Sequence, residues 1–194
     1  MKILVACEFS RTVASAFERA GHNVLSCDLL PAEAPGNHYQ GDVRNVLHEG
    51  WDLMIAHPPC TYLANSGVRW LYERENRWQD LIEGAAFFRE LMEAPIPLKA
   101  IENPIIHKWA RKIIGRGPDQ TIQPWQFGHG EIKAVCLWLD GLPPLTPTDI
   151  VDGREARVHR APPSEDRWKE RSRFYTGIAD AMAKQWGDPL AVAC

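Results

Sequence analysis

The chain lacks several features that would assign it to a common class. Its five cysteines are scattered and form no CxxC pair, which argues against a disulfide framework or a zinc ribbon and fits a reducing compartment. Its seven histidines have no metal-ligand spacing, so no metal site is predicted. No apolar stretch approaches the ~20 residues of a membrane span, and no N-terminal signal is evident. We therefore expect a cytoplasmic protein with neither a membrane nor a metal partner.

An excess of positive charge is also missing. The formal net charge is −3 and the isoelectric point about 6.2, which excludes a general polycation. Any contact with nucleic acid must then come from a local patch of basic side chains. A chain of 194 residues can bury a full hydrophobic core, and we expect residues 1–194 to form a single domain.

What the sequence does contain is an alternation of strands and helices. Apolar runs predict strands at 2–6, 23–27, 51–56, 98–101 and 134–139, with a weaker extended stretch running into 41–43. Helical spacing predicts helices at 11–20, 75–93 and 179–186, the first with Ser10 as its N-cap. This alternation with short links predicts a doubly wound, Rossmann-like α/β fold. A proline- and arginine-rich segment at about 141–173 predicts a short irregular insertion.

The most informative segment is Pro58-Pro59-Cys60, which follows the predicted strand at 51–56. Neither proline has an N–H for a strand ladder, so the strand must end there. The thiol is then held on a stiff turn at the carboxyl end of a strand, which is the edge where open α/β sheets bind ligands. Cys60 is therefore a candidate nucleophile. The alternative is an inert thiol packed in the core, as cysteines often are.

Polar side chains also follow the other predicted strands. They are Glu8, Ser10, Asp28, Asp42, Glu102 and Asn103. Convergence of such residues on one sheet edge is typical of a site. Asp28 is placed to accept hydrogen bonds from a ribose diol, whereas the lack of GxGxxG after the first strand argues against a pyrophosphate. The pattern favours a nucleoside ligand without phosphates, such as S-adenosyl-L-methionine.

The order of these parts resembles the DNA cytosine-5 methyltransferase family. The family's proline-proline-cysteine turn and Glu-Asn dipeptide stand here as His57-Pro58-Pro59-Cys60 and Ile101-Glu102-Asn103-Pro104. The resemblance implies an S-adenosylmethionine-dependent methyltransferase fold and an enzyme that methylates C5 of cytosine in DNA through a covalent Cys60 intermediate. It also implies that Glu102 is the acid that acts at N3 and that Asn103 holds the turn or the glutamate.

The same resemblance implies a set of cofactor contacts. The family's first cofactor loop corresponds to the segment after the first strand, its ribose-binding acid to Asp28, and its late motif to residues 175–180. The residues implied to bind S-adenosyl-L-methionine are Cys7, Glu8, Phe9, Ser10, Asp28, Leu29, Asp42, Val43, Pro58, Thr176, Gly177 and Ile178.

A further set is predicted to contact the substrate. It comprises His57, Pro59, Lys133, Arg154, Arg157, Arg160 and Arg171. Lys133 stands near the family's base-steadying arginine. The four arginines belong to a locally basic stretch with interleaved acids, which would contact phosphates or form a solvated charged face. Trp70, Trp78 and Trp125 are candidates for a base-stacking cleft.

The chain departs from the family in three respects. His57 replaces a usual glycine, Pro104 follows the Glu-Asn pair where valine is common, and the segment between Lys133 and Tyr175 is much shorter than a target-recognition domain. These departures predict a compact, phage-type enzyme of low sequence specificity that acts on a flipped or single-stranded cytosine, with or without a partner for target recognition. Two alternatives stay open: an enzyme that modifies free pyrimidine nucleotides, and a catalytically silent module that binds cofactor or nucleic acid.

Overall fold

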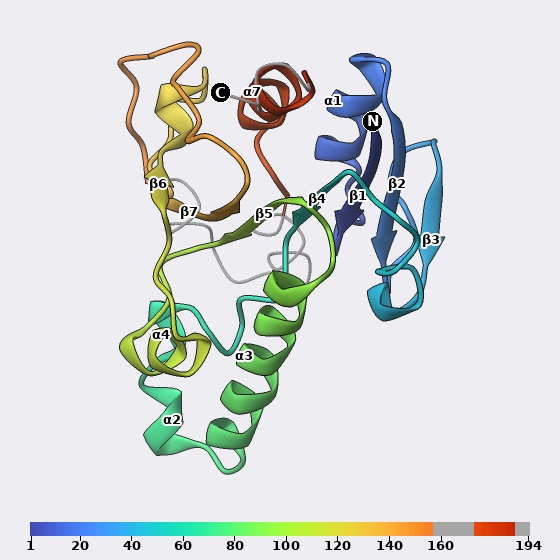
Figure 1. The fold of residues 1–194 in the computed structure, drawn as a ribbon. Helices are drawn as coiled ribbons and strands as arrows, with labels where there is room; N and C mark the ends of the chain where they lie inside the picture. The colour runs from blue at the N-terminus through green and yellow to red at the C-terminus, as the bar shows by residue number, and fades with distance from the viewer. Residues whose placement is uncertain (157–172, 189–194) are drawn as a thin grey trace.

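The computed structural model describes residues 1–156 and 173–188, and a seven-stranded sheet forms its centre (Figure 1). The strands are β1 (Lys2–Ala6), β2 (Asn23–Asp28), β3 (His38–Gln40), β4 (Leu53–Ala56), β5 (Leu98–Asn103), β6 (Gln120–Ile122) and β7 (Val135–Asp140). Their order is β3-β2-β1-β4-β5-β7-β6. β7 is antiparallel to both of its neighbours, and the other pairs are parallel.

Helices cover both faces of this sheet. They are α1 (Thr12–Arg19), α2 (Trp70–Glu73), α3 (Arg77–Glu93), α4 (Lys108–Ile114) and α7 (Thr176–Trp186), with short 3-10 helices η1 (Val43–Asn45), η2 (Asn65–Gly67) and η3 (Pro124–Gln126). α1 and α7 pack against each other over one face, while α3 covers the other. The described part of the chain therefore has the doubly wound, Rossmann-like α/β fold that the sequence predicts.

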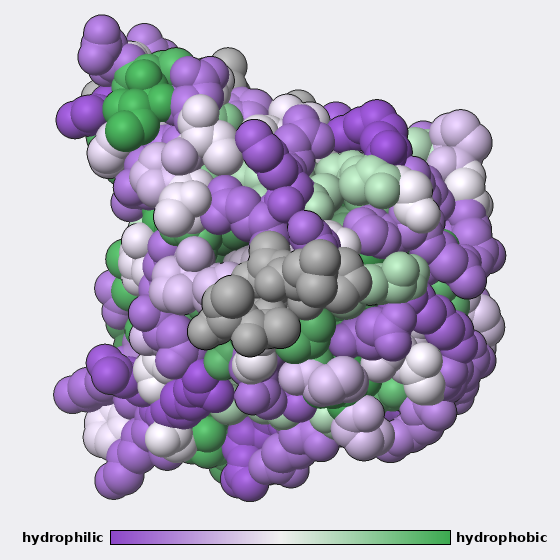
Figure 2. Space-filling model, turned by 45° about the horizontal axis from the view of Figure 1, so that its top comes forward, coloured by the Kyte–Doolittle hydropathy of each residue, from purple (hydrophilic) through white to green (hydrophobic). Residues whose placement is uncertain are grey.

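Two hydrophobic clusters lie on opposite faces of the sheet because the side chains of each strand alternate. In β1, Ile3 and Val5 face the cluster under α1 and α7, whereas Leu4 and Ala6 face the cluster under α3. Burial on both faces explains why the central strands are continuously apolar in sequence. Figure 2 shows one face of the exterior, where hydrophilic side chains predominate and apolar ones form small groups. Within the described residues, no helix is long and apolar enough to cross a membrane.

Most of the predicted strands and helices are confirmed, with corrections at their ends. The weak third strand is His38–Gln40 rather than a stretch ending at Val43, because Val43 begins η1. α2, α4 and β6 have only four, seven and three residues, which is too short for a periodic signal, and the sequence does not predict them. Residues 141–156 contain no helix or strand.

The predicted N-cap of the first helix is wrong. Arg11 occupies the N-cap position in the left-handed region, with φ of 58°, and α1 begins at Thr12. The Ser10 hydroxyl accepts from the N–H of Thr12 at 3.3 Å, but the carboxylate of Glu8 accepts the shorter hydrogen bonds from the N–H groups of Val13 (2.6 Å) and Ala14 (3.1 Å). A carboxylate at this end is favoured because the first N–H groups of a helix have no partner within the helix.

Arg11 is fully buried and joins three segments around this loop. Its guanidinium donates hydrogen bonds to the Ser26 hydroxyl (2.8 Å) and the Pro35 carbonyl (3.1 Å), and it pairs with Glu18 of α1. A Cβ at Gly36 would overlap the guanidinium, so the chain passes Arg11 at a glycine with φ of 136°. The single arginine therefore holds α1, β2 and the loop that follows β2 together.

We expect Arg11→Met to lower the free energy of unfolding by about 3 kcal/mol, because it leaves the buried carbonyls and Glu18 without their partner. Arg19→Met on the same helix is the matched control. Arg19 is exposed and pairs with the exposed Asp180, so its loss should cost less than about 1 kcal/mol. Urea denaturation measures both values. Equal effects would contradict the role given to Arg11.

Candidate active site

The register of the sheet brings four strand ends to one level. The residues paired there are Cys27 of β2, Ala6 of β1, Ala56 of β4 and Ile101 of β5. The residues that come next along these strands are Asp28, Cys7, His57 and Glu102. The backbone N–H of His57 donates to the Ala6 carbonyl at 2.9 Å, which continues the pairing past the end of β4. Polar and reactive side chains therefore stand in a row along the carboxyl edge.

A side-chain hydrogen bond ties the proline turn to the end of β5. The amide Nδ2 of Asn103 donates to the carbonyl of Pro58 at 2.8 Å, and both residues are buried. A proline has no N–H to donate, but its carbonyl can still accept. Asn103 therefore sets the position of the turn that carries Cys60 relative to the residue beside it, Glu102.

His57 and Glu102 form a second link between these turns. Nδ1 of His57 lies 3.2 Å from a carboxylate oxygen of Glu102, and the two side chains are only 11% and 15% exposed. The His57 ring also packs on Phe174, with the ring centroids 4.8 Å apart. The imidazole therefore sits between the acid and the segment that leads into α7.

Two buried polar atoms at this edge have no hydrogen-bond partner within the described residues. They are Nε2 of His57 and Oδ1 of Asn103. Leaving a buried donor or acceptor unpaired costs about 1–3 kcal/mol, and native proteins rarely tolerate it without a reason. Because each atom belongs to one of the two linked turns, a polar ligand at this edge could satisfy both.

Cys60 is exposed on a turn whose backbone is well fixed. The Cys60 carbonyl accepts hydrogen bonds from the N–H groups of Leu63 (3.1 Å) and Ala64 (2.8 Å). The buried guanidinium of Arg77 donates to the carbonyl of Thr61 at 2.5 Å. The thiol is therefore presented to solvent from a rigid segment, as a nucleophile requires.

Three other thiols, those of Cys7, Cys27 and Cys136, are in a different environment. Burial raises the pKa of the Cys7 thiol, and the neighbouring Asp28 carboxylate raises it further. Burial also raises the pKa of Cys27 to about 12 and that of Cys136 above its ordinary value. These thiols stay protonated near neutral pH, so their part in any site is packing or neutral contact.

Asp28 itself is half-buried at the end of β2. One of its oxygens accepts a hydrogen bond from the backbone N–H of Leu30 at 2.9 Å, and burial raises its pKa above the ordinary value. The next side chain, Leu29, is 72% exposed. The predicted ribose acceptor thus lies one strand away from Cys7, with an apolar side chain beside it.

The other predicted cofactor residues near β1 and β3 mainly have structural contacts. Glu8 is buried and engaged with α1, while Ser10 lies 3.4 Å from its carboxylate. Phe9 is buried outside both hydrophobic clusters, and its carbonyl accepts from the N–H of Glu33. Asp42 caps η1, and the hydrogen bond from the backbone of Arg44 lowers its pKa. Val43 packs in the core.

The segment that begins α7 contacts His129, and the unpredicted Phe174 just before it contacts His57 at the sheet edge. Thr176 and Gly177 contact the ring of His129, which accepts from the N–H of Gly177 at 3.0 Å, and Ile178 is buried in the core. A Cβ at Gly177 would lie 1.8 Å from the Phe127 carbonyl, so this helix start requires glycine. Phe174, one position before Tyr175, contacts His57 instead. Its aromatic character was the only signal for it in the sequence.

The predicted substrate residues are spread over several segments. Pro59 is exposed beside Cys60. Nζ of Lys133 lies 5.5 Å from the ring of Tyr175, whose hydroxyl donates to Glu131 at 3.0 Å. Arg154 lies over the ring of Trp125 at 4.1 Å. Arg157, Arg160 and Arg171 lie outside the described residues.

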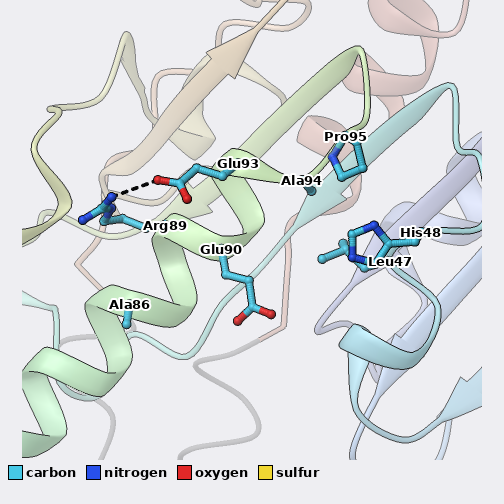
Figure 3. Close-up of a pocket in the computed structure, with 8 residues that line it drawn as sticks. All are labelled: Leu47, His48, Ala86, Arg89, Glu90, Glu93, Ala94 and Pro95. Carbon is cyan, nitrogen blue, oxygen red and sulfur yellow. Dashed lines mark hydrogen bonds and ion pairs between the residues drawn. The ribbon is translucent and has the colours of Figure 1, made fainter.

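A surface pocket of about 330 Å³ lies elsewhere, between the C-terminal part of α3 and the segment after η1 (Figure 3). Its charged groups are paired: Arg89 with Glu93 at 3.0 Å, and Glu90 with Arg44 at 2.8 Å. The pocket adjoins Pro95, before the start of β5, and so lies away from the carboxyl edge.

Among the described residues, no group of three His, Cys, Asp or Glu side chains could hold a metal ion.

Comparison with known proteins gives limited information. No family model and no curated protein matches the chain. Among solved structures, it is similar to a mutant DNMT2 of Spodoptera frugiperda, with 14% identity over 79% of this chain and a TM-score of 0.40. The match covers 54% of that protein, so the chain spans about half of its length. The site is therefore interpreted from its own geometry.

The different thiol environments predict selective modification. In a Cys194→Ser background, which removes the cysteine outside the described residues, we expect one fast reaction with Ellman's reagent at pH 8, at Cys60. Burial and a raised pKa should make the other thiols at least 100-fold slower, because a higher pKa leaves less thiolate and burial restricts access to it. Cys60→Ala should remove the fast phase. A fast phase that survives this substitution would contradict the described environments.

Proposed function

We propose that the chain is an S-adenosylmethionine-dependent methyltransferase that transfers a methyl group to C5 of cytosine in DNA through a covalent intermediate on Cys60. The observation that supports this most strongly is the pair of links between the Cys60 turn and the Glu102-Asn103 turn. Asn103 donates to the Pro58 carbonyl, and His57 lies within hydrogen-bond distance of Glu102. A nucleophile and an acid held in one frame are what addition to a pyrimidine requires.

The cofactor side of the edge fits a nucleoside. Asp28 ends β2 with a carboxylate that can accept hydrogen bonds from a ribose diol, and Leu29 offers an exposed apolar side chain beside it. The first loop contains no glycine cradle for a pyrophosphate, although Cys7 and Arg11 adopt the left-handed conformation that glycine usually fills. S-adenosyl-L-methionine would supply an electrophilic methyl group on its sulfonium.

Cys60 would open the reaction. Cytosine C5 is a weak nucleophile, and addition of the Cys60 thiolate to C6 converts the ring into an enamine that is nucleophilic at C5. Negative charge develops at N3 during this addition. A proton delivered from the carboxyl of Glu102 neutralises it, and the nearby imidazole of His57 can hydrogen-bond to that carboxyl.

Release reverses these proton and bond changes. After C5 has gained its methyl group, loss of the C5 proton to water restores the C5–C6 double bond as the C6–S bond breaks. The N3 proton returns to Glu102, and Cys60 leaves as a thiolate. Because a base inside a duplex cannot reach an edge of this kind, the cytosine must be flipped out or already single-stranded.

The first test is transfer of a labelled methyl group from S-adenosylmethionine to cytosine-containing DNA. We expect Cys60→Ala to abolish transfer and Glu102→Gln to reduce kcat by about 10²–10⁴-fold, because the acid at N3 is lost. Asn103→Ala should also lower kcat, through displacement of the turn.

Cys194→Ala and Glu93→Gln are the matched controls and should transfer at the unaltered rate. Transfer by Cys60→Ala at that rate would refute the nucleophile. Transfer to deoxycytidine monophosphate but not to DNA would favour an enzyme of free nucleotides, and a protein that binds the cofactor without any transfer would be a silent binding module.

The raised pKa of Asp28 makes cofactor affinity depend on pH. The ribose needs the carboxylate form, so affinity should fall as the pH falls, beginning at a higher pH than an ordinary aspartate would give. Asp28→Asn should bind about 10–100-fold more weakly at pH 7 and lose this dependence, because a hydrogen bond to a charged acceptor is worth about 1.5–3 kcal/mol. Calorimetry between pH 4.5 and 8 measures both. An identical pH profile in Asp28→Asn would contradict the assignment.

A further inference from the structure

A group of exposed cations lies beside the candidate active site, although the chain as a whole has a net charge of −3. Its members are Arg69, Arg74, Lys108, Arg111, Lys112 and Arg116. Residues 104–118, which include α4, contain four of them and no aspartate or glutamate. The region formed by α2, α4 and these six side chains is called the α2–α4 surface below. Glu73 and Glu75 stand beside Arg74, and Asp119 pairs with Arg116, so the six cations outnumber these acids by three. The excess is a local basic patch of the kind that an acidic protein needs to bind a polyanion.

Part of this surface is concave. Lys108, Arg111, Lys112 and Arg116 line a shallow pocket of about 350 Å³ together with two glycines. The guanidinium of Arg111 lies against Gly117, where a Cβ would come within 2.6 Å of it. Arg116 is paired with Asp119 at 2.5 Å, whereas Arg111 and Lys112 make no ion pair within the described residues. These two cations are thus available to phosphates.

Aromatic rings accompany the cations. Trp78 lies edge-on to both Tyr72 and Trp109, with ring centroids 5.9 and 5.7 Å apart, and the Trp109 N–H donates to the Tyr72 hydroxyl at 3.1 Å. Tyr72 is 68% exposed and Trp78 is 40% exposed. Arg69 and Arg74 both lie over the ring of Trp70. Exposed rings interleaved with cations are typical of surfaces that bind unpaired nucleic-acid strands.

The α2–α4 surface is joined directly to the turn that carries Cys60. Ala64 and Ile106 form an antiparallel bridge, and the N–H of His107 donates to the Leu63 carbonyl at 3.0 Å. The ring of His107 also lies 3.1 Å from the carbonyl of Tyr62. In Figure 1, α2 and α4 lie together at the end of the molecule opposite α1 and α7. A strand bound along this surface would therefore pass next to the thiol.

We propose that the α2–α4 surface binds the sugar-phosphate backbone of the nucleic acid whose cytosine enters the candidate active site. α4 has seven residues and is ~10 Å long, so its cations extend beyond the single phosphate of a free nucleotide. The substrate is then a polynucleotide that this surface holds without regard to sequence. The surface lies outside the segment between Lys133 and Tyr175, which is shorter than a target-recognition domain. This inference rests on the proposed function, since it names the substrate class of that same site.

The test compares two triple variants of the full chain that lose the same formal charge. The first carries Lys108→Gln, Arg111→Gln and Lys112→Gln. The matched control carries Arg19→Gln, Arg89→Gln and Lys184→Gln, which are exposed on α1, α3 and α7. Binding of a fluorescent 30-base single strand and of the corresponding duplex is measured by anisotropy between 50 and 300 mM NaCl. Calorimetry with S-adenosylmethionine and thermal unfolding report whether either variant is damaged.

We expect the first variant to bind the single strand at least tenfold more weakly than the control at 150 mM NaCl. Its slope of log affinity against log salt should be shallower by about 2, because each lost phosphate contact contributes ~0.7–0.9. Cofactor affinity and melting temperature should match the control. Equal DNA affinity and equal slopes in the two variants would overturn the inference, as would a wild-type chain that binds neither oligonucleotide.

Failure of the inference can be told apart from failure of the proposed function. If wild-type protein binds S-adenosylmethionine and methylates deoxycytidine monophosphate but binds no oligonucleotide, the surface is wrong while the chemistry stands. If the first variant loses DNA binding but the wild type transfers no methyl group, the surface stands and the chemistry fails.

Discussion

The hydrogen bond from the Asn103 amide to the Pro58 carbonyl is the interaction on which the candidate site depends. Parallel pairing brings β4 and β5 to the same level, and both prolines then force the chain out of the sheet. The hydrogen bonds at the Cys60 and Thr61 carbonyls hold the later part of this turn, and the Asn103 bond fixes its beginning relative to β5. This hydrogen bond therefore fixes the turn that carries Cys60 relative to the strand end that carries Glu102. Oδ1 of the same asparagine is buried with no partner among the described residues, so it can accept a further hydrogen bond there.

The central strands and the reactive turn could be predicted because their signals are local. A buried parallel strand is apolar on both faces, and two prolines mark its end wherever it lies. Two unpredicted features, the contact of Phe174 with His57 and the burial of Arg11, depend on residues distant in sequence. The prediction of Ser10 as the N-cap of α1 is wrong for a related reason. Ser10 has the usual chemistry, but the left-handed backbone at Arg11 brings the carboxylate of Glu8 to the helix start instead.

His57 adds a titratable side chain to the chemistry available at the edge. Its imidazole gives Glu102 a partner at 3.2 Å, and its second ring nitrogen is buried without a partner among the described residues. The α2–α4 surface adds a second feature, a place where a polynucleotide can bind beside the same edge. In the proposed account, the cations and rings beside the Cys60 turn attract nucleic acid in a salt-dependent manner and do not read its sequence.

The central claim, that Cys60 and Glu102 form one centre for methylation at C5, is tested most directly by trapping. A DNA strand containing 5-fluorocytosine cannot lose a C5 proton after methylation, so it should remain attached to the enzyme in the presence of S-adenosylmethionine. Mass spectrometry of the digested adduct should find the methylated base on the peptide that contains Cys60. No adduct, or an adduct on another residue, would contradict the claim.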